Sequence, residues 1–145
     1  MATFASSVVT PERILVEREV EAVLLRTVDG EITFLAGHSP LIGVVQPGLL
    51  RLQSDDGNVQ RVAVHGGFVE VDEHGVTVLA PIAELAEEID VERARRALQT
   101  AEQRLAELQS AGRGSAEEGE RVDRDVASAE DDKRRAEVRV EVAEG

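Results

Sequence analysis

Several residue types are absent or scarce in this chain of 145 residues. Cysteine, tryptophan and tyrosine do not occur, phenylalanine occurs three times, and the only lysine is Lys133. Without cysteine the chain has no disulfide bond, no thiolate metal site and no cysteine nucleophile. Without tryptophan and tyrosine, a core has to be filled mainly by valine, leucine and isoleucine.

Long apolar runs and an excess of positive charge are also missing. No stretch approaches the roughly 18 apolar residues of a membrane span, and the N-terminal segment lacks the basic and apolar regions of an export signal. The chain carries 29 acidic and 16 basic residues, a net charge of −13. This charge disfavours binding to nucleic acids and docking on anionic lipids.

The density of charged residues changes abruptly near residue 84. About a fifth of residues 1–83 are charged, against nearly half of residues 84–145. A change of this size indicates a domain boundary. We therefore expect one domain over residues 1–84 and a second over residues 85–145.

The first domain has the pattern of short β-strands. Apolar, β-branched runs recur about every ten residues, and turn signals such as Asp29-Gly30 separate them. The alternation of apolar residues changes phase at Gly66-Gly67, which indicates a bulge or a sharp bend. The pattern predicts an antiparallel β-sandwich of about ten short strands.

The second domain has the pattern of two helices, expected at about 90–110 and 116–142. Asp90 and Ser115 stand at the positions that cap such helices. Both helices carry narrow apolar seams with spacings of three and four: Val91, Ala94, Leu98, Ala101, Leu105 and Leu108, then Val122, Val126, Ala129, Lys133, Ala136, Val140 and Ala143. Two such seams joined by a short loop predict an antiparallel helical hairpin.

This hairpin has little apolar surface of its own. Its seams are rich in alanine, which contributes less on burial than the roughly 1.5–3 kcal/mol of a fully buried leucine. Lys133 also interrupts the second seam. The two helices therefore need the sandwich, a partner or a ligand to pack against, and we expect a movable element.

Catalysis or metal binding by the histidines is disfavoured. His38 and Ser39 are adjacent, and chain neighbours rarely face each other as a base and a nucleophile must, while Pro40 favours a structural turn. His65 and His74 lack the spacings that bring imidazoles together on a metal, and His65 suits a buried hydrogen bond. A small hydrolase using Ser39 and His38 remains an alternative that Ser39→Ala tests.

The arginines of the second helix leave two interpretations open. Arg135 and Arg139 are four residues apart, so they share a helical face and are able to hold one anionic group. The alternative, which their spacing alone favours, is pairing with the many neighbouring Glu and Asp side chains on solvated faces.

Several segments of the first domain form a recognisable series. Residues 30–41 read GEITFLAGHSPL, a Pro-Gly turn and an apolar strand follow, and VHGGFVEV and GVTVLA come after them. In this order, and followed by a two-helix hairpin, they resemble the epsilon subunit of bacterial F-type ATP synthases over nearly the whole chain. Thr33 and Ala36 replace the usual Gly and Pro of that family, which affects the loop and not the fold.

The resemblance implies a non-catalytic subunit of the rotating central stalk in a proton-translocating ATP synthase. In that family the sandwich binds the gamma subunit and rests on the c-ring of the membrane sector. The hairpin lies on the sandwich, or extends to the catalytic alpha and beta subunits and inhibits ATP hydrolysis. The likeness also implies a peripheral position at the cytoplasmic face of the bacterial plasma membrane, without insertion into lipid. The residues expected at an interface belong to the signature segment: Gly37, His38, Ser39, Pro40, Leu41 and Ile42.

Some members of that family also bind ATP on the folded hairpin. Their Ile/Leu-Asp-x-x-Arg-Ala motif is matched at residues 89–94, and Thr100 stands where the pattern has a further basic residue, which weakens phosphate contact. No cofactor is required, and the likeness assigns a regulatory ATP to Glu84, Ile89, Asp90, Arg93, Ala94, Arg135 and Arg139. Without nucleotide, Asp90 is simply a helix N-cap.

A different class of function remains open, an independent β-sandwich binding module that is oligomerised by its heptad helices. Seams that pair between chains give an oligomer, whereas seams that pair within one chain give a monomer. Light scattering of the isolated chain separates the two.

Overall fold

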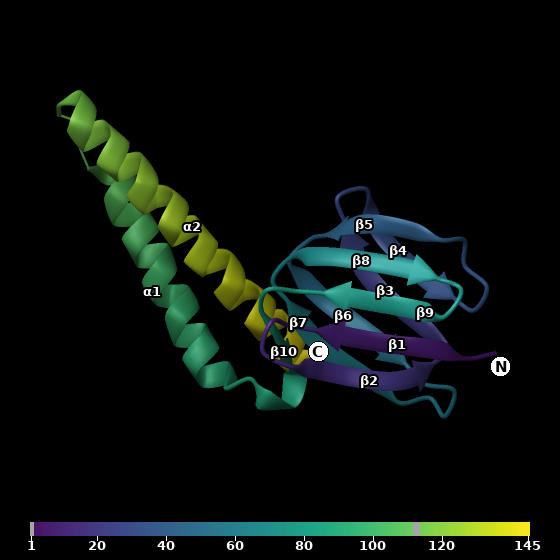
Figure 1. Cartoon of the computed structure of the whole chain (residues 1–145). Helices are drawn as coiled ribbons and strands as arrows, with labels where there is room; N and C mark the ends of the chain where they lie inside the picture. The colour runs from purple at the N-terminus through teal and green to yellow at the C-terminus, as the bar shows by residue number, and fades with distance from the viewer. Residues whose placement is uncertain (1, 112–113) are drawn as a thin grey trace.

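A β-sandwich and a helical hairpin make up the computed structural model, which describes residues 2–111 and 114–145 (Figure 1). The strands within these residues are β1 (Phe4–Val9), β2 (Ile14–Val20), β3 (Ala22–Thr27), β4 (Gly30–Leu35), β5 (Leu41–Val45), β6 (Gly48–Gln53), β7 (Val59–Val64), β8 (Gly67–Asp72), β9 (Gly75–Leu79) and β10 (Ala83–Leu85). A short 3-10 helix η1 (Ala86–Glu88), α1 (Val91–Ser110) and α2 (Ala116–Glu144) follow. The predicted fold class is confirmed.

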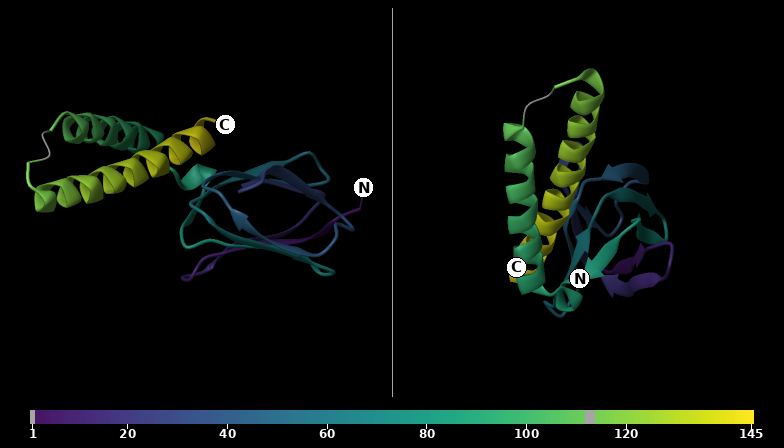
Figure 2. Two further views of the ribbon diagram at one scale, coloured as in Figure 1. Left: turned by 90° about the horizontal axis from the view of Figure 1, so that it is seen from above. Right: turned by 90° about the vertical axis from the view of Figure 1, so that its left-hand side faces the viewer.

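The strands form two layers that one continuous hydrogen-bonded path connects (Figure 2). The path runs β10-β7-β6-β3-β5-β8-β9-β1-β2, and β4 pairs with β3. Thr27 of β3 pairs with Val45 of β5 where the path passes from one layer to the other. Among the described residues β1 and β9 pair in parallel, and the other pairs are antiparallel. The alternation of apolar residues does not reveal this parallel pair because it reports the buried face of a strand and not its direction.

Valine and leucine fill the space between the layers. Phe34 is fully buried among them, whereas Phe68 is exposed. The largest fully buried side chains are those of Phe34, Leu50, Leu52, Val8, Val20, Val23, Val62, Val64, Val69, Val78 and Val142, and all except Val142 belong to this core. The core is therefore aliphatic, as the scarcity of aromatic residues predicts.

Gly66 and Gly67 form the corner between β7 and β8. Of the bulge and the sharp bend that the sequence pattern allows here, the structure has the sharp bend. Their φ angles are +90° and +127°, a region that L side chains rarely adopt. A Cβ on Gly67 would lie 2.1 Å from the carbonyl oxygen of Leu79. This corner leaves His65 directly after the end of β7.

The two helices pair as their seams predict. Ala94 and Ala101 of α1 are buried, as are Ala129 and Ala136 of α2, and Lys133 stays half-exposed beside Glu137, with 3.8 Å between the Nζ and carboxylate atoms. Both predicted caps form: Arg93 N donates to Asp90 Oδ1 at 3.1 Å, and Glu118 N donates to Ser115 Oγ at 3.2 Å. Because the two seams pack against each other within one chain, they are not free to pair with a second chain. This disfavours the alternative of a binding module that is oligomerised by its helices.

The hairpin is attached to the sandwich through a second apolar face of α2. Val138 and Val142 pack against Ala63 of β7, with half-buried Leu49, Ala86 and Ile89 around them. The seam analysis missed Val138 and Val142 because they lie outside its three-four spacing. Beyond this contact the paired helices extend away from the sandwich, so that their loop end lies far from it (Figures 1 and 2).

Replacing both Val138 and Val142 by Asp is expected to detach the hairpin without unfolding the sandwich. Docking would bury two carboxylates that have no partner, at a cost of several kcal/mol. Hydrogen exchange at the backbone amides of residues 138–142 should therefore accelerate at least about tenfold.

Ala127→Asp, on the exposed side of α2, is the control for this detachment and should leave the exchange rate unchanged. An unaltered rate in the double variant would show that these valines do not hold the hairpin.

Candidate functional site at the joint of sandwich and hairpin

An open cavity of about 370 Å³ lies where β10, η1, α1 and α2 meet. Its volume is in the range of small-ligand sites. Six of the seven residues that the resemblance assigns to ATP line it: Glu84, Ile89, Asp90, Arg93, Ala94 and Arg139. Glu88 and Ala97 also line it, and the sequence analysis did not find them because they lie outside the matched motif.

Arg135, the seventh residue, does not line this cavity. Its guanidinium contacts the carboxylate of Asp131, one turn earlier on α2. Arg134 also lies near Asp131, with 3.5 Å between the paired atoms. Of the two arginines only Arg139 therefore lines the cavity, and Arg135 pairs locally as the alternative interpretation expects.

The carboxylates of the cavity already have partners, while one guanidinium has none. Asp90 caps α1, and Glu88 Oε2 lies 3.1 Å from Nη2 of Arg13 in the loop after β1. Among residues 2–111 and 114–145, no carboxylate pairs with the guanidinium of Arg93. Arg93 is thus the cation of the cavity that is available to an anionic ligand.

Glu84 connects the sandwich to α2. Its Oε1 accepts hydrogen bonds from Arg139 Nε at 2.7 Å and from His65 Nε2 at 3.2 Å. The hydrogen bond from His65 and then the bond and charge of Arg139 lower the pKa of Glu84 from 4.5 to about 2, against the opposing effect of burial. The carboxylate is therefore ionised throughout the neutral pH range.

The signature loop around His38 is a turn and not a catalytic pair. Gly37 has a φ of +81°, and His38 N donates to the carbonyl oxygen of Leu35 at 3.1 Å. His38 Nδ1 bonds the backbone oxygen of Ser39 at 2.8 Å and not its hydroxyl, and the imidazole meets Phe34 edge-on with 4.8 Å between ring centroids. The imidazole of His38 therefore does not bond the Ser39 hydroxyl, and the pair lacks the base-nucleophile contact that a hydrolase needs.

The predicted interface residues lie at the end of the sandwich opposite the hairpin (Figure 1). Gly37, His38 and Pro40 line a shallow cavity of about 380 Å³ there. Leu41 packs against the core, whereas Ile42 on β5 is 78% exposed. This end thus offers a fixed loop beside an exposed apolar side chain.

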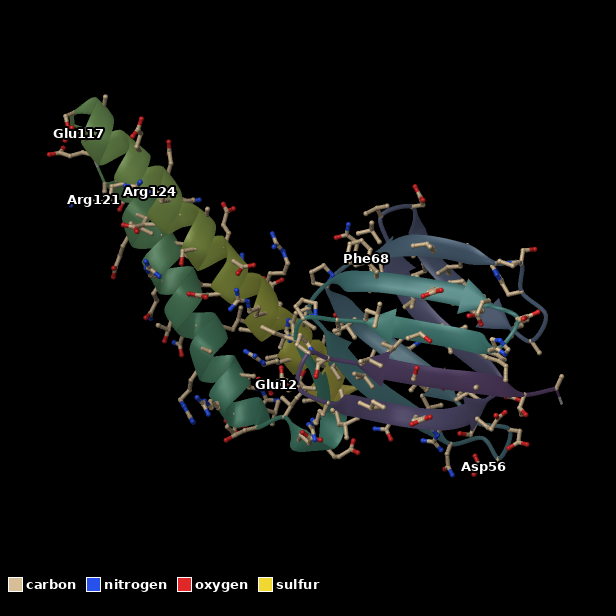
Figure 3. All side chains as sticks on the ribbon, viewed as in Figure 1. Glu12, Asp56, Phe68, Glu117, Arg121 and Arg124 are labelled. Atoms are coloured by element: carbon tan, nitrogen blue, oxygen red, sulfur yellow. The ribbon has the colours of Figure 1, made fainter. Side chains whose placement is uncertain are left out.

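A third surface is an apolar hollow of about 640 Å³ on the sandwich. Phe68, marked on β8 in Figure 3, is 55% exposed there, and Val44 and Leu79 are exposed beside it. Val9, Pro11 and Pro81 also line the hollow. Contiguous exposed apolar side chains mark protein contacts, and sequence patterning did not single out this hollow because its residues come from distant strands.

Two kinds of feature are missing from the described part of the chain. Residues 2–111 and 114–145 contain no group of three or more His, Asp or Glu side chains placed to hold a metal ion. In the same ranges, no helix is both long enough and apolar enough to cross a membrane.

The family to which the chain belongs follows from the models of known protein families that match its sequence. Residues 3–86 match the model of the beta-sandwich domain of the ATP synthase delta/epsilon chain, and residues 87–118 match that of its long alpha-helix domain. The chain belongs to the ATP synthase delta/epsilon chain family. By this membership it is a non-catalytic subunit of ATP synthase, and the resemblance seen in the sequence is confirmed. The family match ends at residue 118, near the start of α2, so it covers neither Arg135 nor Arg139.

Individual relatives agree with this assignment. The chain is 50% identical to the ATP synthase epsilon chain of Desulforudis audaxviator over 105 residues, which cover 72% of this chain and 76% of the relative. It is 47% identical to that of Symbiobacterium thermophilum over 106 residues, with the same coverage. A chain of the Euglena gracilis mitochondrial ATP synthase has a TM-score of 0.78 at 24% identity, over 100% of this chain and 83% of that one. At this identity the last likeness concerns the fold alone.

Glu84→Gln is expected to lower the free energy of unfolding by about 1–2 kcal/mol at pH 7, since the 29% exposure of Glu84 screens the lost charged interactions. Because the folded state lowers the pKa of Glu84 from 4.5 to about 2, its stabilisation is complete above about pH 4.5 and is lost as the pH falls toward 2. Urea unfolding at pH 7, 5, 4 and 3 should therefore show a constant difference from wild type above pH 5 and a shrinking one below.

Glu73→Gln is the matched control because the Glu73 side chain is 85% exposed, and it should change stability little at any of these pH values. A difference between Glu84→Gln and wild type that does not shrink in acid would contradict the assigned hydrogen bonds.

Proposed function

We propose that the chain is a central-stalk subunit of a bacterial F-type, proton-translocating ATP synthase. Its sandwich couples the catalytic head to rotation of the c-ring, and its hairpin inhibits ATP hydrolysis when it leaves the sandwich. The observation that carries the proposal is the attachment of the hairpin, which depends on one end of α2 while most of both helices lies clear of the sandwich.

The contacts at this attachment support a movable hairpin. Val138 and Val142 supply its buried apolar contact, and the Arg139–Glu84 bond supplies its polar one. These groups contribute a few kcal/mol in total, a difference that a competing partner surface is able to offset. Most of the 29-residue α2 keeps its pairing with α1 when it moves, so that the hairpin stays folded. Only the last turns of α2, which lose the support of Ala63, fray in the detached form.

Two surfaces of the sandwich suit the partners that the stalk requires. The end with Gly37, His38 and Pro40 faces away from the hairpin and suits contact with the c-ring. The hollow around Phe68 suits an apolar surface of the gamma subunit. The extended hairpin would reach the alpha and beta subunits. Contact with the c-ring holds the chain at the cytoplasmic face of the plasma membrane.

The cavity at the joint suits regulatory ATP, and bound ATP would hold the hairpin on the sandwich. Arg93 on α1 and Arg139 on α2 come from separate helices, and Glu84 of the same cavity belongs to β10. A nucleotide that fills the cavity would therefore contact both helices and the sandwich at once. Arg139 is already bound to Glu84, and Thr100 supplies no charge. Phosphate would therefore compete with Glu84 for Arg139, and we expect weak affinity.

Removal of residues 89–145 is expected to abolish inhibition and preserve binding to gamma, because the sandwich core does not include those residues. The full chain should lower ATP hydrolysis when added to a catalytic head of alpha, beta and gamma subunits that lacks epsilon. The shortened chain should leave the hydrolysis rate at the level of the head alone. ATPase assays and pull-down on gamma measure the two effects.

Val138→Asp with Val142→Asp gives an independent comparison, since it frees the hairpin without removing it and should inhibit at least as strongly as the wild type. Equal hydrolysis rates with and without the full chain would contradict the inhibitory role.

Calorimetric titration of the isolated chain with ATP is expected to give binding in the high micromolar to millimolar range. Arg93→Ala should weaken it at least about tenfold, since a charge-assisted hydrogen bond to phosphate contributes roughly 1.5–3 kcal/mol. Arg124→Ala is the control, because Arg124 lies toward the end of the hairpin that is far from the sandwich (Figure 3). This variant should bind ATP with the same affinity as the wild type. Absence of heat at millimolar ATP would sink the nucleotide proposal and leave Asp90 as a helix cap.

A further inference from the structure

His65 lies beside Glu84 on the face of the sandwich that receives α2. In the β7–β10 pair, Glu84 is opposite Ala63, and His65 N donates to the carbonyl oxygen of Ile82 at 3.1 Å, which continues the ladder. Ala63, His65 and Glu84 therefore share one face as direct and diagonal neighbours. Ala63 is the residue against which Val138 and Val142 pack, so this face is the seat of the hairpin.

The Oε1 atom of Glu84 is shared between two donors from different domains. His65 belongs to the sandwich and Arg139 to α2, and both bond that atom, at 3.2 Å and 2.7 Å. Glu84 also lines the joint cavity, whose free cation is Arg93. Without a second bond, the flexible carboxylate would be able to turn toward Arg93 or solvent and away from Arg139.

The hydrogen-bond chemistry determines which imidazole nitrogen carries the proton. An ionised carboxylate only accepts hydrogen bonds, so His65 Nε2 must be protonated and must donate. The His65 side chain is 4% exposed, and its Nδ1 is buried without a partner among residues 2–111 and 114–145. The imidazole thus has one polar contact in the described structure, and that contact is Glu84.

We propose that His65 is a positioning residue that holds the Glu84 carboxylate in place for Arg139 and thereby determines how firmly the hairpin is seated. The inference rests on the proposed mobility of the hairpin and requires no nucleotide. It assigns a role to a side chain of the sandwich that does not line the joint cavity. His65 acts through Glu84, so its effect must disappear when Glu84 no longer has a charge to present.

Two variants of similar size separate this role from simple filling of space. His65→Gln keeps an N–H donor near the position of Nε2, whereas His65→Leu fills the volume without a donor. In the leucine variant, amide exchange at residues 138–142 should accelerate about tenfold, the effect of losing one charge-assisted hydrogen bond. In the glutamine variant, the rate should stay within about twofold of the wild type.

A second readout follows the carboxylate itself. NMR titration of Glu84 should show a pKa that rises toward its usual 4.5 in His65→Leu and stays low in His65→Gln, because the hydrogen bond from His65 is the main cause of the low pKa. In a Glu84→Gln background, His65→Leu should change the exchange rate less than about twofold.

Three results would overturn the proposal. One is equal behaviour of the leucine and glutamine variants, and another is an equal effect of His65→Leu with and without Glu84. The third is unprotected amides at residues 138–142 in the wild type, which would mean that the seated hairpin is not populated. All these measurements use the isolated full chain, so they are independent of whether the hairpin inhibits ATP hydrolysis.

Discussion

The contact between the end of α2 and β7 is the interaction on which the arrangement of the two domains depends. Val138 and Val142 bury their side chains on Ala63, and Arg139 reaches Glu84 beside them. Each fully buried valine contributes roughly 1.5–3 kcal/mol before the cost of ordering. The sandwich has its own aliphatic core and is stable without this contact. The position of the hairpin, in contrast, depends on it.

Glu84 connects the attachment of the hairpin with the candidate ligand site because it takes part in both. It lies on β10, lines the cavity at the joint, and accepts hydrogen bonds from His65 and Arg139. A ligand that attracts Arg139 competes with Glu84, and a change at His65 alters what Glu84 presents. The strength of the attachment is therefore set by a small group of polar atoms together with the two buried valines.

Sequence periodicity predicted the parts of the fold that repeat. The strand alternation, both helix caps and the Ala-rich seam were all predicted because each is a local pattern. Val138 and Val142 were missed because they contact a strand about 75 residues away and follow no repeat within α2. The parallel pairing of β1 with β9 was missed for a similar reason, since pairing between distant strands leaves no local signal.

The candidate site also has a part that the sequence predicted and a part that it did not. The motif at residues 89–94 placed its residues in one cavity because they are close in sequence and begin one helix. Arg135 and Arg139 were grouped by their spacing, yet Asp131 one turn away pairs with Arg135. The role of His65 was not visible, because a histidine before two glycines does not reveal that Glu84 will lie beside it.

The central claim is that the hairpin exists in a seated and an extended position, and a distance measurement tests it most directly. The absence of native cysteine permits spin labels at Asp56→Cys, on the β6–β7 loop of the sandwich, and at Arg124→Cys, toward the far end of the hairpin (Figure 3). Electron-electron double resonance on the isolated chain should give one main distance, that of the seated form. In the complex with alpha, beta and gamma subunits during inhibited hydrolysis, a second distance should appear. The same single distance in both samples would contradict the account.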